Sequence, residues 1–388
     1  MKKFFFYLEQ PLDNPANNSY QKRDVIKFFV NRKSLDWYNA RLLISFKLTA
    51  LNGNLVRVND NNGMVNGAHS FIKKISFSIN GRKVYDCNYA NQVINIRNLL
   101  EYDTQYADSI ASNEFYFLDT SINPSADEFM VSGTNQLAKR RPAFNKGFAV
   151  RKEVLGTSSI VNCEVPLNRY SFFNVLSNKL LPGEEFELFV EIENDNNLTW
   201  RTTLVNLRTV ITNLQLVIPK FQPKLTTRSW SYLNEYVVTL LNLRQKEGIF
   251  KITNSISKPR HVFVFIINKT KVSSPANNPF LYNTFNVVNN KKLLRCYLTV
   301  NNDTYPINHY KPTTEIARIC GVVMAYNNFQ GGLLNINNFK SLFPFIHFNL
   351  SKSNYEDVEL TFHYELSGET NNDYHIFAIV LHEKLYNS

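Results

Sequence analysis

Hydrophobic and polar residues alternate along much of the chain. The clearest alternation lies at 186–192, 210–218, 294–300 and 358–366. In the first of these segments, the apolar residues from Phe186 to Ile192 alternate mostly with glutamates. Because successive side chains of a strand point to opposite faces, this pattern predicts antiparallel strands with one buried and one solvated face.

Two further segments are apolar at nearly every position. Residues 262–267 and 374–381 contain almost no polar side chain, and both are rich in Val, Ile and Phe. A short apolar run of this kind is typical of a strand that is covered on both faces. We therefore predict that these two segments are central strands.

Only two segments have a helical pattern. In 91–102, Val93, Ile96 and Leu100 fall on one helical face, and 313–326 has the same type of pattern after Pro312. Proline is favourable at the start of a helix, where its missing N–H leaves no intrahelical bond unmade. The prediction is an all-β protein with short helices in its loops.

The order of these elements occurs twice. Residues 75–86 predict a hairpin whose turn is Asn80-Gly81, and 294–306 predict another with its turn at Asn301 and the following asparagine. Asn-Gly favours such a turn because both residues can adopt positive φ. Each hairpin precedes one of the two predicted helices, which indicates an internal duplication.

A second pair of segments supports the duplication. Residues 168–195 and 338–368 both run from an aromatic cluster through a polar turn into an alternating strand. The first repeat has extra residues at 103–160, where the pattern is weak, so we expect a long inserted loop there. Prolines at 219 and 223 mark the boundary between the repeats. We predict two tandem β-sandwiches, 1–219 and 220–388.

Three segments resemble a known family. Residues 67–102, with the motif ISFSINGRKVYD, resemble the strand, hairpin and helix of double jelly-roll major capsid proteins. Residues 165–195 and 341–385 resemble the ends of the first and second jelly rolls of that family. The nearest members are those of polintons, virophages and adintoviruses, which are related to adenovirus hexons and to the coat proteins of tailless phages.

The resemblance implies a fold and a function. The expected fold is two eight-stranded antiparallel jelly rolls, and the expected function is a major capsid protein whose homotrimers mimic hexamers and tile an icosahedral shell. Its implied partners are neighbouring trimers, a penton or minor capsid protein, and the genome or an inner membrane. The protein would be made in the host cytoplasm, assemble there or in the nucleus, and reside in the virion. An endogenised viral copy would have the same sequence features.

Composition narrows the function classes. The chain has 388 residues, 44% of them hydrophobic, and a net charge of +11, which excludes an extended disordered protein. No apolar run reaches the roughly 18–20 residues that span a bilayer. The apolar segment near Met1 is too short for a signal peptide, and the four cysteines are far apart, so we expect no secretion and free thiols.

No catalytic or cofactor motif is present in the sequence. The seven histidines form no HxH or HExxH motif, and both GxxxxGK[ST] and GxSxG are missing. We therefore expect no metal, no cofactor, no small-molecule substrate and no enzymatic activity. Two alternatives stay open, a tandem β-sandwich that binds carbohydrate and one that processes glycans.

One basic cluster in the inserted loop is a candidate contact site. Its members are Lys139, Arg140, Arg141, Lys146, Arg151 and Lys152. These cations can contact neighbouring capsid subunits, the genome or an anionic membrane, since they interact favourably with phosphate at short range. A solvated loop and a nuclear import signal are the other interpretations.

Overall fold

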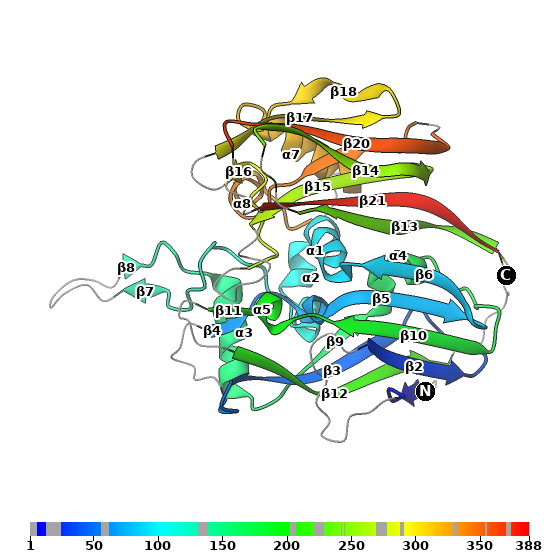
Figure 1. The fold of residues 1–388 in the computed structure, drawn as a ribbon. Coiled ribbons are helices and arrows are strands. Elements are labelled where there is room, and N and C mark those ends of the chain that lie inside the picture. Colours follow the sequence, from blue (N-terminus) through cyan, green and yellow to red (C-terminus); the bar gives the residue numbers. More distant parts are fainter. Residues whose placement is uncertain are drawn as a thin grey trace.

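Figure 1 shows the fold of the protein in a computed structural model. The described residues are 6–12, 25–55, 62–130, 139–201, 207–220, 229–241, 243, 245–268, 278–287, 291–328, 332–353, 355–369 and 374–387. Within these ranges, the main strands form two pairs of antiparallel sheets, one pair before residue 220 and one pair after it. The two pairs lie one above the other in Figure 1.

The first pair of sheets contains eight long strands. One sheet has the order β1 (Phe6–Glu9), β12 (Leu207–Pro219), β3 (Arg41–Ala50) and β9 (Val161–Pro166). The other has the order β2 (Val25–Asn31), β10 (Glu185–Ile192), β5 (Ile72–Ile79) and β6 (Arg82–Asn88). Two small ribbons lie outside them, formed by β4 (Asn62–Met64) with β11 (Thr199–Arg201) and by β7 (Phe129–Met130) with β8 (Lys139–Arg140).

The second pair repeats the arrangement. One sheet has the order β13 (Ser229–Leu240), β21 (Tyr374–Asn387), β15 (Pro259–Asn268) and β19 (Ile346–Asn349). The other has the order β14 (Glu247–Ser257), β20 (Asp357–Leu366) and β17 (Lys291–Val300), and β17 also pairs with β16 (Asn286–Val287) and β18 (Asp303–Tyr310).

Strand order identifies both halves as the same topology. When the eight long strands of each half are numbered along the chain, the sheets read 1-8-3-6 and 2-7-4-5 in both halves. This order is that of a jelly roll, in which strands distant in sequence become neighbours. The predicted fold of two tandem jelly-roll sandwiches is confirmed.

The duplicated hairpins and helices are also present. Asn80 and Gly81 connect β5 to β6 with φ of 48° and 75°, and Asn301 has φ of 53° between β17 and β18. Each hairpin leads to a helix, α1 (Ala90–Glu101) in the first half and α7 (Ile316–Met324) in the second. The bounds of α1 lie within one residue of the predicted ones, and those of α7 within three.

The inserted segment 103–160 contains more structure than predicted. It forms α2 (Thr104–Ala107), η2 (Ile110–Glu114) and the helix α3 (Lys146–Thr157). The buried side of α3 includes Gly147, Arg151 and Lys152 as well as Phe148, so it has no apolar stripe that a sequence pattern could reveal. Other short helices are α4 (Ser171–Asn174), α5 (Asp195–Leu198), α8 (Ile336–Ser341), η1 (Ala68–Phe71), η3 (Leu167–Arg169) and η4 (Ala325–Asn327). Among the described helices, none has the length and apolar character to cross a membrane.

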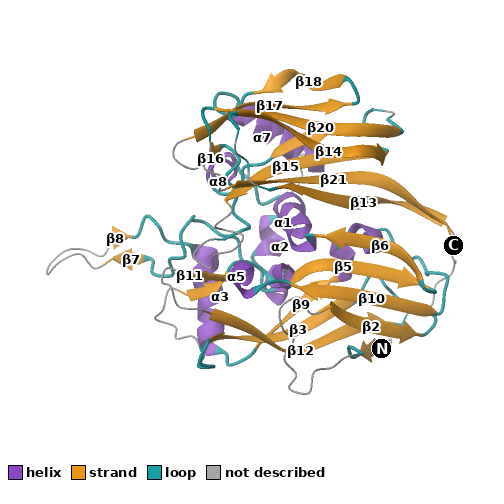
Figure 2. Cartoon of the chain, in the orientation of Figure 1, coloured by secondary structure: helices purple, strands orange, loops and turns teal. Residues whose placement is uncertain are grey.

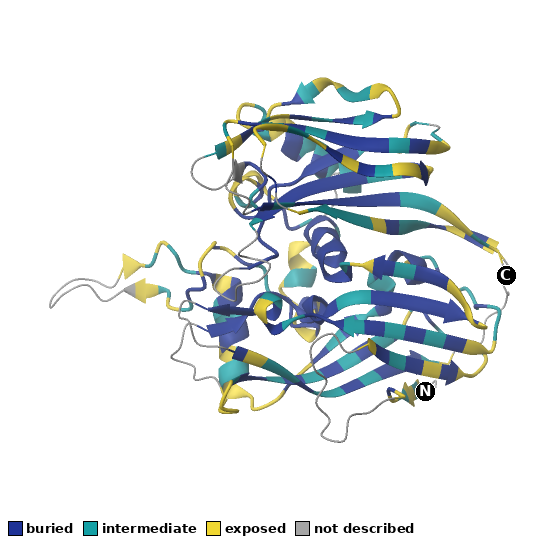
Figure 3. Ribbon diagram, in the orientation of Figure 1, coloured by how far each residue is buried: buried dark blue, intermediate teal, exposed yellow. Residues whose placement is uncertain are grey.

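The two segments predicted to be covered on both faces are central strands. β15 lies between β21 and β19, β21 lies between β13 and β15, and residues 262–267 of β15 are all buried (Figure 3). One face of this sheet packs inside its own sandwich, where Phe348 contacts Phe362 of β20. The other face lies toward the first half, where Phe377 contacts Tyr89 with ring centroids 5.3 Å apart. The central strands β15 and β21 therefore need apolar side chains on both of their faces.

Two glycines give a matched test of the helix environments. A Cβ at Gly147 would lie 2.3 Å from the carbonyl oxygen of Leu118, whereas a Cβ at Gly321 would meet no atom within 4 Å. Gly147→Ala is expected to destabilise the protein by about 1–3 kcal/mol, as overpacking does. Gly321→Ala is expected to stabilise it by up to about 1 kcal/mol, because alanine favours a helix. Urea unfolding measures both, and equal effects would contradict the packing described for α3.

Candidate functional site

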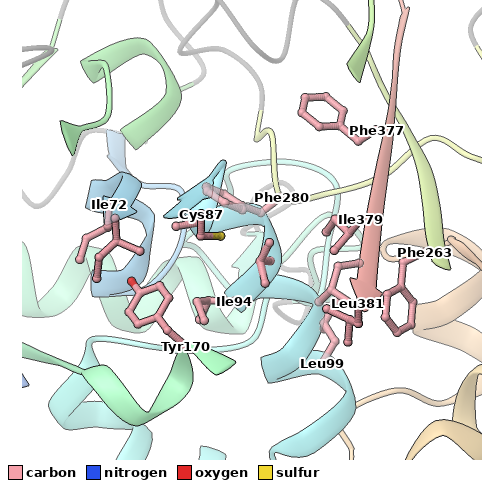
Figure 4. Close-up of a cluster of buried hydrophobic side chains, with 14 of the residues drawn as sticks. Ile72, Cys87, Ile94, Leu99, Tyr170, Phe263, Phe280, Phe377, Ile379 and Leu381 are labelled. Carbon is pink, nitrogen blue, oxygen red and sulfur yellow. The ribbon is translucent and has the colours of Figure 1, made fainter. Parts of the chain in front are cut away.

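The interface between the two halves, called the seam below, is centred on α1. Every residue from Ala90 to Leu100 is buried, and Figure 2 shows this helix between the two groups of sheets. In Figure 4, Leu99 of α1 lies beside Leu381 of β21, whereas Ile94 lies on the opposite side, beside Tyr170 of the first half. The helix therefore belongs to the core of both halves.

Two polar residues of α1, Gln92 and Asn95, form hydrogen bonds with the second half. The side-chain amide of Asn95 donates to the carbonyl of Phe280 at 3.3 Å and to the hydroxyl of Tyr282 at 2.8 Å. The amide of Gln92 donates to the carbonyl of Pro279 at 3.2 Å. Because buried polar groups are costly when they lack partners, these bonds fix how the second half sits on α1.

A buried carboxylate also joins the halves. Glu235 of β13 accepts hydrogen bonds from the hydroxyl of Tyr85 and the backbone N–H of Ser171, both at 2.9 Å. The guanidinium of Arg97 lies 3.9 Å away and pairs more closely with Glu101, at 2.8 Å. Burial raises the pKa of Glu235, and Arg97 opposes that shift. The carboxylate thus depends on first-half donors for its stability.

A second buried ion pair holds the inserted segment. Arg151 of α3 contacts Asp119 at 2.6 Å and donates from Nε to the carbonyl of Met64 at 3.0 Å. The other oxygen of Asp119 accepts a bond from Asn278 of the second half at 2.9 Å. The insertion is therefore attached to both sandwiches.

This arrangement places the residues of the basic cluster in two different environments, one buried and one on the outside. Arg151 is fully buried and Lys152 is 5% exposed, so neither is part of an exposed basic surface. Their inclusion in the candidate contact loop is corrected, because α3 turns both side chains inward. No local sequence pattern indicates this burial, since the acid that pairs with Arg151 lies 32 residues earlier.

The other four basic residues lie on the outside. Lys139 and Arg140 are exposed on β8, in the ribbon that projects from the body in Figure 1, and Lys146 is exposed at the start of α3. Arg140 lies 3.6 Å from Glu128, and Arg141 is half-buried at 3.5 Å from Asp127. Acidic neighbours therefore offset part of the positive charge of this ribbon.

The described residues offer little for nucleophilic or metal chemistry. Among them, no group of three His, Cys, Asp or Glu side chains could hold a metal ion. All four cysteines are free and buried, and burial raises the pKa of their thiols. A surface hollow of about 700 Å³ next to Asn80 contains Lys33 and Glu184, but these two charges pair with each other.

Two buried histidines, His69 and His347, and the partly buried His261 are held neutral. Burial lowers the pKa of His69 to about 3, of His347 to about 3 and of His261 to about 4. His261 and His347 contact each other through ring nitrogens 3.1 Å apart. Both ring nitrogens of His69 lack a hydrogen-bond partner among the described residues. Neutral, inaccessible imidazoles contribute to the core and are not placed for proton transfer to a substrate.

Comparison with known proteins adds information only at the level of structure. The sequence matches no family model, and no curated protein sequence matches it. The mavirus major capsid protein aligns with a TM-score of 0.56 at 13% identity, over 98% of this chain and 87% of that one. The Faustovirus major capsid protein has a TM-score of 0.56 at 10% identity, over 99% and 90%. A PBCV-1 virus capsid structure has a TM-score of 0.52 at 9% identity, over 99% and 94%.

The chain has the double jelly-roll fold of viral major capsid proteins. The resemblance inferred from 67–102, 165–195 and 341–385 is thereby confirmed for the fold. The alignments span nearly the whole double jelly roll, so both halves and the seam between them lie within the shared architecture.

The buried ion pair of the double jelly roll can be tested by removing one partner. Arg151→Met leaves Asp119 buried without its cation, and we expect a loss of about 3–5 kcal/mol in the free energy of unfolding. Adding Asp119→Asn should recover part of that loss. The exposed Arg140→Ala should change stability by no more than about 0.5 kcal/mol. Chemical unfolding compares the three variants, and an Arg151→Met protein as stable as Arg140→Ala would contradict the pairing.

Acid sensitivity follows from the neutral histidines. An unfolded histidine titrates near pH 6.5, so the unfolded state binds more protons than the fold as the pH falls from there toward 3 or 4. Stability should decline over this window by up to about 1.4 kcal/mol per pH unit for each buried histidine. His69→Phe should reduce the slope, and His309→Phe, at a more exposed position, should reduce it less. Urea unfolding between pH 7.5 and 4.5 measures the slopes, and an unchanged slope in His69→Phe would refute this origin.

Proposed function

We propose that this protein is a major capsid protein that assembles as a homotrimer and tiles an icosahedral virus shell. The observation that carries the proposal is the duplicated 1-8-3-6 and 2-7-4-5 topology, which extends over nearly the whole chain and is shared with viral capsid proteins. Two sandwiches per chain give six in a trimer, and such a block fits the six-fold positions of a shell. Because the chain is 13% identical to the mavirus protein, the proposal is based on the shared fold and on the interface between the two halves, and not on sequence similarity.

The seam supports a structural role. Its apolar contacts and its bonded polar groups, including Glu235 and Asn95, hold the sandwiches in one relative position. A shell subunit needs this property, because small contacts between subunits specify curvature only when each subunit is stiff. We assign the jelly rolls to 1–219 and 220–388, with 103–160 as an insertion in the first.

A non-enzymatic role is part of the proposal. It is supported by capsid-protein neighbours in the comparisons and by the buried state of the described cysteines, which leaves their thiols inaccessible. The carbohydrate-binding and glycan-processing alternatives have no comparable observation in their favour. Residence in the virion, with synthesis in the host cytoplasm and assembly there or in the nucleus, follows from the capsid function.

The partners follow from the same proposal. Neighbouring trimers and a penton or minor capsid protein would complete the shell. The exposed residues Lys139, Arg140 and Lys146, together with the half-buried Arg141, would contact an anionic neighbour, either the genome or an inner membrane. Arg151 and Lys152 are left out of this contact because they are buried.

Purified protein gives a direct test. Sedimentation should yield a particle of about 135 kDa, three times the chain mass of 45.1 kDa. Negative-stain images should show pseudo-hexagonal blocks and, at high concentration, curved or flat arrays of them. A stable monomer that forms no arrays would contradict the capsid function. A monomer that binds immobilised glycans would favour the carbohydrate-binding alternative.

A further inference from the structure

Corresponding helices of the two halves differ in how they are covered. Both α1 and α7 follow the fifth strand of their jelly roll. Every residue of α1 from Ala90 to Leu100 is buried, whereas within α7 only Ile319, Cys320 and Val323 are buried. The difference arises because the second half covers α1, and no element of the chain's described part covers α7 in the same way.

The fifth strands show the same difference. In β6, the carbonyl of Val84 accepts a bond from Tyr232 of β13 at 2.8 Å, and Tyr85 donates to Glu235. The corresponding strand of the second half is β18, where Ile307 is 89% exposed. Contact with a partner would remove the apolar area of this side chain from water, which is favourable.

The first strands complete the comparison. In β13, Trp230 and Tyr232 are buried against Phe172 of the first half. In β1, the corresponding first strand, Phe6 is 52% and Leu8 is 54% exposed. The first half therefore presents an apolar edge that corresponds to the edge which the second half already buries in the seam.

We infer that the seam within the chain is repeated between chains: β1 and the outer face of β12 of one copy pack against β18 and α7 of the next. This inference rests on the proposed trimer and assigns its contact residues. The occupant is a second copy because the two uncovered surfaces are the counterparts of two surfaces that already bind each other. Contacts of this head-to-tail kind are heterologous, and three of them close a ring.

The contact between copies is not identical to the internal seam. Phe172, which fills the internal seam against Trp230 and Tyr232, belongs to α4, between β9 and β10. In the second half no described helix lies between β19 and β20. The apolar contact between copies therefore depends more on Phe6, Leu8 and Ile307, which makes these positions sensitive to substitution.

Charge substitutions test the contact. Ile307→Asp and Leu8→Asp should each weaken trimer formation at least about tenfold, because a charged group would be buried where an apolar one is expected. Ile249→Asp is the matched control, since Ile249 is 65% exposed on β14, at the opposite edge of the sheet that contains β18. Sedimentation velocity over a concentration series measures the trimer, and thermal unfolding checks that each variant folds.

Cross-linking tests the head-to-tail geometry independently. The four native cysteines are buried, so a thiol introduced at an exposed position is the preferred target of a short bis-maleimide. The double variant Leu8→Cys/Ile307→Cys should yield covalent dimers and trimers, whereas each single variant should yield none. Efficient dimers in either single variant would indicate a symmetric two-fold contact and would overturn the inference.

The outcomes separate this inference from the proposed function. If the wild-type protein, Ile307→Asp and Leu8→Asp all form trimers and the double cysteine variant gives no cross-links, the assigned contact is refuted. The proposed capsid function is then unaffected. A wild-type protein that stays monomeric and forms no arrays refutes the capsid function. The assignment would also be overturned if Ile249→Asp weakened trimer formation as much as Ile307→Asp does.

Discussion

The structure depends on one constraint, the complete burial of α1 between two sandwiches. A helix with as many polar as apolar residues can be buried on all sides only when each polar group has a partner. The second half supplies partners for Gln92 and Asn95 through the backbone carbonyls of Pro279 and Phe280 and the hydroxyl of Tyr282. The first half supplies them for Asn91 and Arg97. The relative position of the halves is consequently set by directional bonds as well as by apolar contact, which is non-directional.

Much of the fold is predictable because a strand with one buried and one solvated face has alternating apolar and polar residues in the sequence. The alternation in β10, β12 and β20, the Asn80-Gly81 turn and the apolar strands β15 and β21 all express local geometry or coverage by a single core. The sequence pattern predicts neither the helix α3 nor the strand β1. The buried side of α3 is partly polar, and β1 is a four-residue edge strand whose partner lies about two hundred residues later.

The seam could not be predicted, for a related reason. Arg97, Glu235 and Arg151 are charged, and a charged residue in a sequence is ordinarily expected at the surface. Their burial depends on partners from distant segments, such as Asp119 for Arg151, which no local pattern connects. The basic cluster illustrates the same limit, since its six cations comprise three exposed residues, the half-buried Arg141 and two residues that belong to the core.

The pairing of β1 with β12 has a consequence for synthesis on the ribosome. Strands β2, β3, β5 and β6 emerge early, but β1 has no hydrogen-bonded neighbour until β12 has left the exit tunnel, because Phe6 pairs with Pro219. The first jelly roll is thus closed by its last strand, before the strands of the second have emerged. A nascent chain at that stage carries α1 with the side that contacts the second half exposed to water, and the apolar residues on that side stay open to aggregation until translation delivers β21.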